Sequence, residues 1–337
     1  MITISKACPI IFRPPRGFTF VEILVTCAIL TILGLLLCVV IGNMIQLSSQ
    51  ATSSLSVNQN AREALDLIGR DLTKAALPWS RGTVNTTISN TLQFVVNPTL
   101  SGLPASPVYA CPHTMFWQAP ISRNQSSGDL AIVGYFVLSD LQTDRSKSRF
   151  QLRRVYIEPQ DTTPTYANNY SIYSSPTTTP TFGVPTWLSV TNLANFGPTT
   201  LAADAGSIPP YAGWVADGVL AMWVRCLDRQ NNPITQYFSV AGNASVTTNY
   251  QYDSHFGYYS SPYIYTSNVV PAYVEVGLVC IAPPDVAKLS ALPAYSATTP
   301  NNFTTEIQAF AAAVRTNNPS VKSVVIYDRE FYLYGSD

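Results

Sequence analysis

The first part of the chain combines a long apolar run with a helical pattern that continues beyond it. From Ile23 to Met44 no residue is charged, and a helix needs about 20 such residues to cross roughly 30 Å of hydrocarbon. Apolar residues then recur near helical spacing as far as Leu72, until Pro78 ends the pattern. The sequence therefore predicts one helix over residues 18–76, apolar at first and amphipathic later.

After Pro78 the pattern changes to short runs rich in β-branched and aromatic residues, which predict strands. A turn at Asp228–Pro233, "DRQNNP", is predicted to join the fourth and fifth of them as a hairpin. A helix over Thr304–Asn317 and a β-like run over Val321–Tyr334 follow. The six predicted strands are Thr91–Val96, Leu130–Leu138, Phe150–Glu158, Gly218–Asp228, Ile234–Val240 and Ala272–Ala282.

These elements predict an α+β fold, in which a long N-terminal helix packs on a mainly antiparallel sheet. Two stretches rich in Thr, Ser, Asn and Tyr, Asp161–Thr186 and Ala241–Asn268, are predicted loops. They are either solvated insertions or surfaces for adaptable contacts, since paratopes use a similar Tyr/Ser/Asn mixture. Since no convincing linker divides residues 78–337, we expect a single head there.

One carboxylate, Glu22, lies at the start of the apolar run. A charged side chain in a membrane segment is costly and by default has a function and a partner. The alternative is an interfacial residue that reaches the headgroups. Lys6, Arg13 and Arg16 precede the run, which predicts a cytoplasmic N-terminus and an exported remainder. The balance of 19 basic and 19 acidic side chains gives no indication of a nucleic-acid partner.

The stretch Gly17–Glu22, G-F-T-F-V-E, stands ahead of the apolar helix and resembles the processing motif of type IV prepilins and type II secretion pseudoprepilins. The resemblance implies that prepilin peptidase cuts between Gly17 and Phe18 and that Phe18 becomes N-methylated. It also implies that the Phe18 ammonium and Glu22 pair between neighbouring subunits during assembly. An uncleaved signal anchor is the alternative that hydropathy leaves open.

Later segments carry a weaker resemblance to particular members of this class. "ALDLIGRDLTKAALP", "DGVLAMWVRCLDRQNNPI" and "VPAYVEVGLVCIAP" stand in the order seen in J-type minor pseudopilins. "HTMFWQAPI" and "VGYFVLSD" are similar to the Verru_Chthon cassette protein C family. Together with the large head, these resemblances imply a minor subunit, at or near the tip of a filament.

The sequence carries few residues that point to catalytic or metal chemistry. The two histidines, His113 and His255, have no ligands at metal spacing, and the common enzyme motifs are absent. We therefore expect no enzyme activity, no metal and no cofactor. Asp228–Pro233 and Asp140–Ser148 are oxygen-rich, but neither has the spacing of a calcium loop, so calcium remains only an alternative.

Three cysteines, Cys111, Cys226 and Cys280, lie outside the leader and the apolar run. Buried thiols are the simplest interpretation. However, Cys226 and Cys280 fall on predicted strands and could face one core, so a disulfide is a second hypothesis that requires a favourable register. Glu275 interrupts an apolar strand and predicts either a solvated cross-strand ion pair or a contact with a sister subunit.

The sequence thus predicts a leader (1–17), a membrane and filament-core helix (18–45), an amphipathic continuation (46–77) and a β-rich head (78–337). The expected location is the inner membrane in a single pass, and then a filament. The expected partners are prepilin peptidase, other pilins or pseudopilins and the inner-membrane assembly platform. The alternatives are an exported enzyme or binding domain that uses the segment only as an anchor, and an adhesin head with Tyr250–Tyr265 as its surface.

Overall fold

The structure is a computed structural model, and the chain forms two compact units, Met1–Thr52 and Ser53–Asp337. Discrete ranges of the chain are described. These are residues 19–75, 93–97, 114–119, 131–141, 143–145, 148–157, 212–234, 236–238, 250–254, 257–260, 263–265, 271–293 and 302–333.

The long helix predicted from the pattern is present as α1 (Phe20–Leu72), which has 53 residues. It ends in a turn at Thr73 and Lys74, a few residues before the predicted end. In the first unit its described side chains are all exposed, whereas from Val57 onward one stripe of the helix is buried. The buried stripe lies within the predicted amphipathic continuation (46–77), but it begins at Val57, whereas Leu47 and Leu55 are exposed.

Within the described ranges, the largest sheet of the head is antiparallel, with six strands in the order β5-β4-β3-β2-β1-β8. Its strands β1, β3 and β4 fall within or close to predicted runs, while β2, β5 and β8 were not predicted. The strands are β1 (Phe94–Val96), β2 (Met115–Ala119), β3 (Ala131–Asp140), β4 (Arg149–Ile157), β5 (Ala212–Asp217) and β8 (Tyr252–Asp253).

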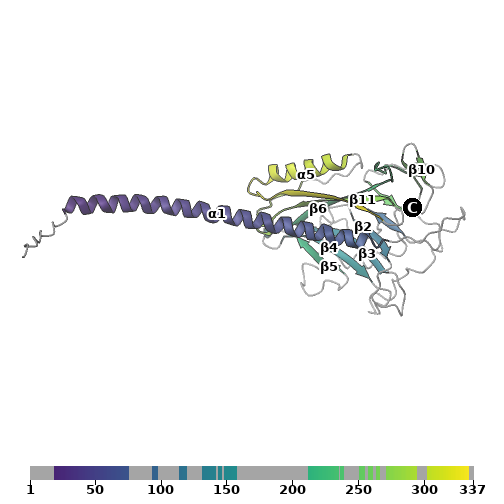
Figure 1. The fold of residues 1–337 in the computed structure, drawn as a ribbon, viewed down its shortest axis with the longest axis horizontal. Coiled ribbons are helices and arrows are strands. Elements are labelled where there is room, and N and C mark those ends of the chain that lie inside the picture. Colours follow the sequence, from purple (N-terminus) through teal and green to yellow (C-terminus); the bar gives the residue numbers. More distant parts are fainter. Residues whose placement is uncertain are drawn as a thin grey trace, which may run out of the picture. The chain divides into compact units, whose positions relative to one another are not determined.

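A second antiparallel sheet has the order β12-β11-β6, built from β12 (Val325–Tyr332), β11 (Tyr273–Cys280) and β6 (Val219–Leu227). Helix α5 (Phe303–Asn317) covers one face, and its close approach to β11 requires Gly277, where an added Cβ would lie 2.4 Å from Ile307 Cδ1. The end of α1 contacts the other face, as Figure 1 shows. All three strands and α5 were predicted from the sequence.

The chain passes from the six-stranded sheet to the second sheet at Gly218, between β5 and β6. Gly218 has φ 75°, and an added Cβ would lie 2.1 Å from the carbonyl oxygen of Ile281. Its N–H donates to Phe150 O and its carbonyl accepts from Ile281 N. Because glycine has no side chain, the backbone of Gly218 can hydrogen-bond to β4 of one sheet and to the end of β11 of the other.

A third, small sheet corrects two predictions. It has the order β10-β9-β7, with β10 (Tyr263–Tyr265), β9 (Gly257–Ser260) and β7 (Gln236–Phe238). The fifth predicted run, which contains β7, thus pairs with β9 and not along β6. The predicted loop 241–268 likewise contains three short strands. Such short strands depend on distant partners, which local pattern does not reveal.

The turn at Asp228–Pro233 is present. Asp228 is buried, and its carboxylate accepts hydrogen bonds from the backbone N–H groups of Gln230 and Asn232. Among the described residues, the returning chain pairs with β6 through the bridge between Leu227 and Pro233 and the bond from Ile234 N to Cys226 O. The oxygen-rich composition of this turn is therefore explained by a carboxylate that organises its own backbone.

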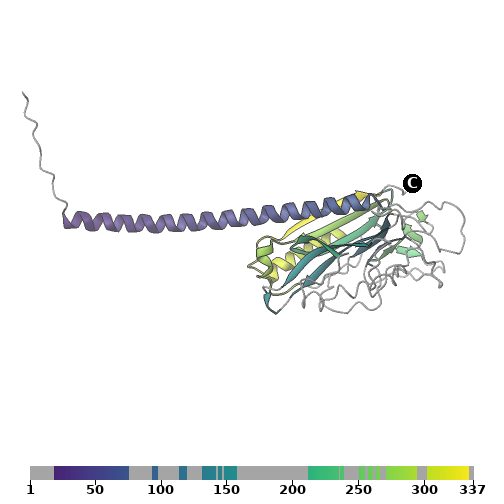
Figure 2. The same ribbon diagram turned by 90° about the horizontal axis from the view of Figure 1, so that it is seen from below.

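The core lies where residues 53–72 of α1 run beside the strands (Figure 1, Figure 2). The buried stripe of α1 packs in one cluster with side chains of the six-stranded sheet and of the β12-β11-β6 sheet. Six of its residues are buried at helical spacing, namely Val57, Ala61, Ala64, Leu65, Ile68 and Leu72.

A buried polar network fixes the end of α1 to the six-stranded sheet. Asp71 Oδ2 accepts a hydrogen bond from Tyr135 OH on β3 at 2.6 Å and forms an ion pair with Arg154 Nε on β4 at 2.6 Å. The Asp71 side chain is 5% exposed and that of Arg154 is 22% exposed. Burial, together with the Asp71 charge, raises the pKa of Tyr135 above its ordinary value, which keeps its hydroxyl a donor.

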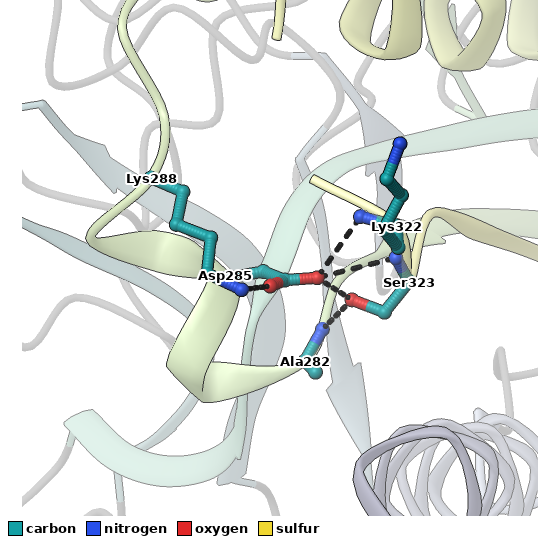
Figure 3. A network of polar contacts seen from close by, with 5 residues as sticks. All are labelled: Ala282, Asp285, Lys288, Lys322 and Ser323. Carbon is teal, nitrogen blue, oxygen red and sulfur yellow. Dashed lines mark hydrogen bonds and ion pairs between the residues drawn. The ribbon is translucent and has the colours of Figure 1, made fainter. Parts of the chain in front are cut away.

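A second carboxylate joins α4 (Pro283–Val286) to the segment before β12, as Figure 3 shows. Asp285 Oδ2 accepts from the backbone N–H groups of Lys322 and Ser323 and from Ser323 Oγ, while Oδ1 accepts from Lys288 Nζ at 2.6 Å. Burial alone raises the pKa of Asp285, but the hydrogen bonds from Lys288 and Ser323 outweigh it, and the pKa lies below its ordinary value.

Candidate functional site: the N-terminal helix segment

Helix α1 begins with a capped first turn. Thr19 precedes the helix, and its Oγ1 accepts a hydrogen bond from the N–H of Glu22 at 3.3 Å. The Thr19 carbonyl also accepts from Ile23 N at 3.2 Å. Thr19 and Glu22 have the T-x-x-E spacing of a capping box, a helix-start signal that is visible in the sequence but was not among the predictions above.

Glu22 lies in the first turn of α1 and is exposed. A negative charge is favourable there because the helix dipole places partial positive charge at the N-terminus. In the described part of the chain, the Glu22 carboxylate takes part in no hydrogen bond or ion pair. Gly17 and Phe18, the predicted cleavage and methylation residues, lie outside the described residues.

The turns after Glu22 present an apolar surface all around the helix. Phe20, Leu30 and Leu36, on different sides of α1, are all more than half exposed. The hydroxyls of Thr26 and Thr31 donate to backbone carbonyls of the preceding turn, which satisfies them within the helix. By length and composition, α1 is able to cross a membrane.

Comparison with known proteins gives one match. Residues 13–37 match the model of the prokaryotic N-terminal methylation motif. This range contains Gly17, Phe18 and Glu22 together with most of the apolar helix. No curated protein and no solved structure matches the chain.

The matched motif and the fold define a class. A methylation motif followed by a long apolar helix, which continues into an α+β head, supports a type IV pilin-like or pseudopilin-like subunit. The motif implies processing by prepilin peptidase and assembly with other pilins, and the apolar helix is consistent with membrane anchoring. Proteins with this motif are generally structural subunits and not enzymes.

The structure gives no support to the hypothetical Cys226–Cys280 disulfide. Both thiols are free, buried and on neighbouring strands of one core, as the pattern suggested. However, Cys226 pairs with Val274, so Cys280 lies six residues further along β11, or about 20 Å at 3.4 Å per residue. A disulfide needs Cα atoms within about 7 Å. Cys111 lies outside the described residues.

Glu275 forms the cross-strand ion pair that was one of its two predicted roles. Its Oε2 lies 2.5 Å from Arg225 Nε on β6, and the two side chains are 12% and 19% exposed. The pair is less solvated than we expected, because the Arg225 guanidinium lies over the Phe303 ring of α5, 4.9 Å from its centroid. Glu275 is thus part of the packing between β6, β11 and α5.

The remaining chemical candidates add no site. His113 and His255 lie outside the described residues, and so do parts of Asp140–Ser148. Within the described ranges, no group of three or more His, Cys, Asp or Glu side chains is placed to hold a metal ion. Asp228, in the other oxygen-rich segment, directs one carboxylate oxygen to two backbone N–H groups of its own turn.

Proposed function

We propose that the protein is a minor pilin or pseudopilin that is inserted with its N-terminus in the cytoplasm, cut between Gly17 and Phe18, and methylated on Phe18. The observation that carries this proposal is the methylation motif over residues 13–37, because it coincides with the start of an exposed helix that carries no charged residue from Ile23 to Met44. Lys6, Arg13 and Arg16, which precede the helix, support the proposed orientation.

The proposed division follows the change in α1. Residues 1–17 form the leader, residues 18–45 enter the membrane and later the filament core, and residues 46–77 connect to a head over 78–337. Burial of one helix stripe from Val57 onward supports the connecting role. A head of this size packs poorly into a tight helical shaft, which favours a place at or near the filament tip.

Glu22 gives assembly its register. A carboxylate at the first turn of an apolar helix lacks water once it is surrounded by other helices, and it needs a positive partner there. Cleavage after Gly17 creates an α-ammonium on Phe18, and the same group on a neighbouring subunit is the proposed partner. The pair would be far stronger in an apolar bundle than in water.

The first experiment is intact-mass analysis of the protein from its native host. We expect a chain that begins at N-methylated Phe18. A chain that keeps residues 1–17 would overturn the proposal and favour an exported enzyme or binding domain on an uncleaved anchor. Deletion of Tyr250–Tyr265 with intact assembly and lost adhesion would instead favour an adhesin role for the head.

The second experiment tests assembly separately from processing. Glu22→Ala should leave cleavage and methylation largely intact but reduce recovery of the protein in sheared filaments. Glu63→Ala, which removes an exposed carboxylate further along the same helix, is the matched control and should be recovered normally. Equal recovery of both variants would exclude the proposed role of Glu22.

A further inference from the structure

The edge strand β5 contains a β-bulge that changes which side chains share a face. Leu152 on β4 pairs with Ala216, but the next residue, Arg153, pairs with Trp214, so Val215 is the additional residue. In a regular strand, residues 214 and 217 would point to opposite faces. Here Val215 and Ala216 both pack against the core, and Trp214 and Asp217 lie together on the outer face.

The two side chains on the outer face form a fixed pair. Trp214 is 58% exposed, yet its indole Nε1 donates to Asp217 Oδ1 at 3.0 Å. This hydrogen bond orients the indole, although little packing surrounds it. An exposed tryptophan in the head is unusual, because burial stabilises a side chain of this size more than exposure to solvent does.

Strand β4 places two polar side chains, Gln151 and Arg153, next to the Trp214–Asp217 pair. Gln151 lies opposite Asp217 in the register, and its Nε2 donates to Asp217 Oδ1 at 2.7 Å. Arg153 lies opposite Trp214, is 5% exposed, and donates to Gln151 Oε1. Oδ1 of Asp217 thus accepts two hydrogen bonds, whereas Oδ2 accepts none from the part of the chain that the structure describes.

We propose that Trp214 and Asp217 form a saccharide-binding site, with Gln151 and Arg153 as the residues that position the carboxylate. A hexose has an apolar face of C–H groups, which stacks on a flat, exposed indole, and a rim of hydroxyls. Asp217 Oδ2 accepts from one of these hydroxyls at the edge of the ring. The ligand class is a neutral hexose polymer, because its apolar C–H face and its hydroxyl rim match the indole and the carboxylate.

The bulge favours a binding role for Trp214 and Asp217 over a purely structural role. Neither Trp214 nor Asp217 contributes to the core cluster, and a regular strand would pair with β4 without an additional residue. Bulges that turn a side chain outward are common beside functional sites. This inference is independent of the proposed filament role, because saccharide binding by the head requires neither processing nor assembly.

The test is a binding titration with the full-length protein, in a detergent without a sugar headgroup, against cellohexaose, maltohexaose and hexa-N-acetylchitohexaose. Calorimetry and tryptophan emission are the readouts. We expect at least one of the three saccharides to bind, and Trp214→Ala to weaken its binding roughly tenfold, or about 1.4 kcal/mol, because the substitution removes the stacking surface. Asp217→Asn should also weaken binding, although an amide oxygen can still accept from the indole.

Two controls keep the result interpretable. Tyr332→Ala removes another exposed aromatic side chain, on β12 of the other sheet, and should bind the saccharide as the original chain does. Trp214→Phe keeps a stacking ring and should bind with intermediate affinity. Absence of binding to all three saccharides, or unchanged binding by Trp214→Ala, would overturn the proposal. Lost filament incorporation by Trp214→Ala without saccharide binding would assign the indole to a protein contact.

Discussion

The ring of Phe331 on β12 lies against Gly69 of α1, in the space that a side chain at position 69 would occupy. A Cβ added to Gly69 would lie 2.6 Å from Cε1 and 2.9 Å from Cδ1 of Phe331. Phe331 is 7% exposed and Gly69 is buried. A glycine in the interior of a helix lowers helix stability by about 1 kcal/mol relative to alanine, so this contact offsets an unfavourable local choice.

Gly69→Ala should therefore destabilise the protein, although alanine favours the helix. Overpacking against Phe331 costs about 1–3 kcal/mol, which exceeds the gain in helix propensity. In a Phe331→Ala background the obstacle is gone, and the same Gly69→Ala change should stabilise by about 1 kcal/mol. Denaturant unfolding of the four proteins of this cycle measures both effects. The same sign in both backgrounds would contradict the contact.

Asp71 should be the most sensitive carboxylate at the end of α1. Asp71→Ala removes the partner of both Tyr135 and Arg154, and breaking such a buried pair costs about 3 kcal/mol. Asp66 makes an exposed ion pair with Arg329, with the two side chains 60% and 52% exposed, so Asp66→Ala should cost no more than about 1 kcal/mol. Unfolding free energies of the two variants test this difference, and equal losses would show that burial does not decide it.

The Asp285 contacts predict a specific pH dependence. A carboxyl whose pKa is lower in the folded chain contributes stability above its unfolded pKa, about 3.9, and loses that contribution as pH falls through the folded pKa. We therefore expect the stability difference between the original chain and Asp285→Asn to shrink below about pH 4.

Lys288→Met provides the control for this pH dependence. It removes one hydrogen bond to Asp285 but leaves those from Lys322 N, Ser323 N and Ser323 Oγ. The pKa of Asp285 should therefore be lowered less, so the loss of stability on acidification should be smaller and should end at a higher pH than in the original chain. Parallel curves for the original chain and Asp285→Asn between pH 2 and 5 would contradict the assigned contacts.

The buried thiols should be chemically inert in the folded head. Burial raises the pKa of Cys280 to about 12 and also raises that of Cys226, so neither thiolate is populated near pH 8. Iodoacetamide should alkylate Cys226 and Cys280 only after denaturation, with or without a reductant, as peptide mass analysis would show. Dependence on the reductant would indicate a disulfide at one of these residues, and alkylation of the folded chain would contradict their burial.

Long, periodic elements could be predicted from the sequence, because their own pattern determines them. The helices α1 and α5 and the strands β6, β11 and β12 were predicted within a few residues. Two strands were not predicted, β2 ("MFWQA") and β5 ("AGWVAD"). Short runs such as these form strands only when they pair with neighbouring strands of a sheet, and the local sequence does not reveal that pairing.

The candidate sites also differ in how far the sequence alone predicts them. The segment Gly17–Glu22 is recognisable because its residues are contiguous, and the Thr19 cap was equally visible. The Trp214–Asp217 pair was not predictable, since it depends on a bulge that exists only when β5 pairs with β4. The separation of Cys226 from Cys280 likewise depends on the register of two strands.

The contact between Phe331 and Gly69 also sets an order of events during synthesis. A chain that emerges from its N-terminus completes α1 long before β12, yet β12 supplies the ring that covers Gly69 and the outer strand beside β11. The packing of α1 in the head is therefore complete only after β12 has been synthesised. Any cellular step that acts on a folded head therefore depends on synthesis of β12, and a nascent chain remains distinguishable from a finished one until then.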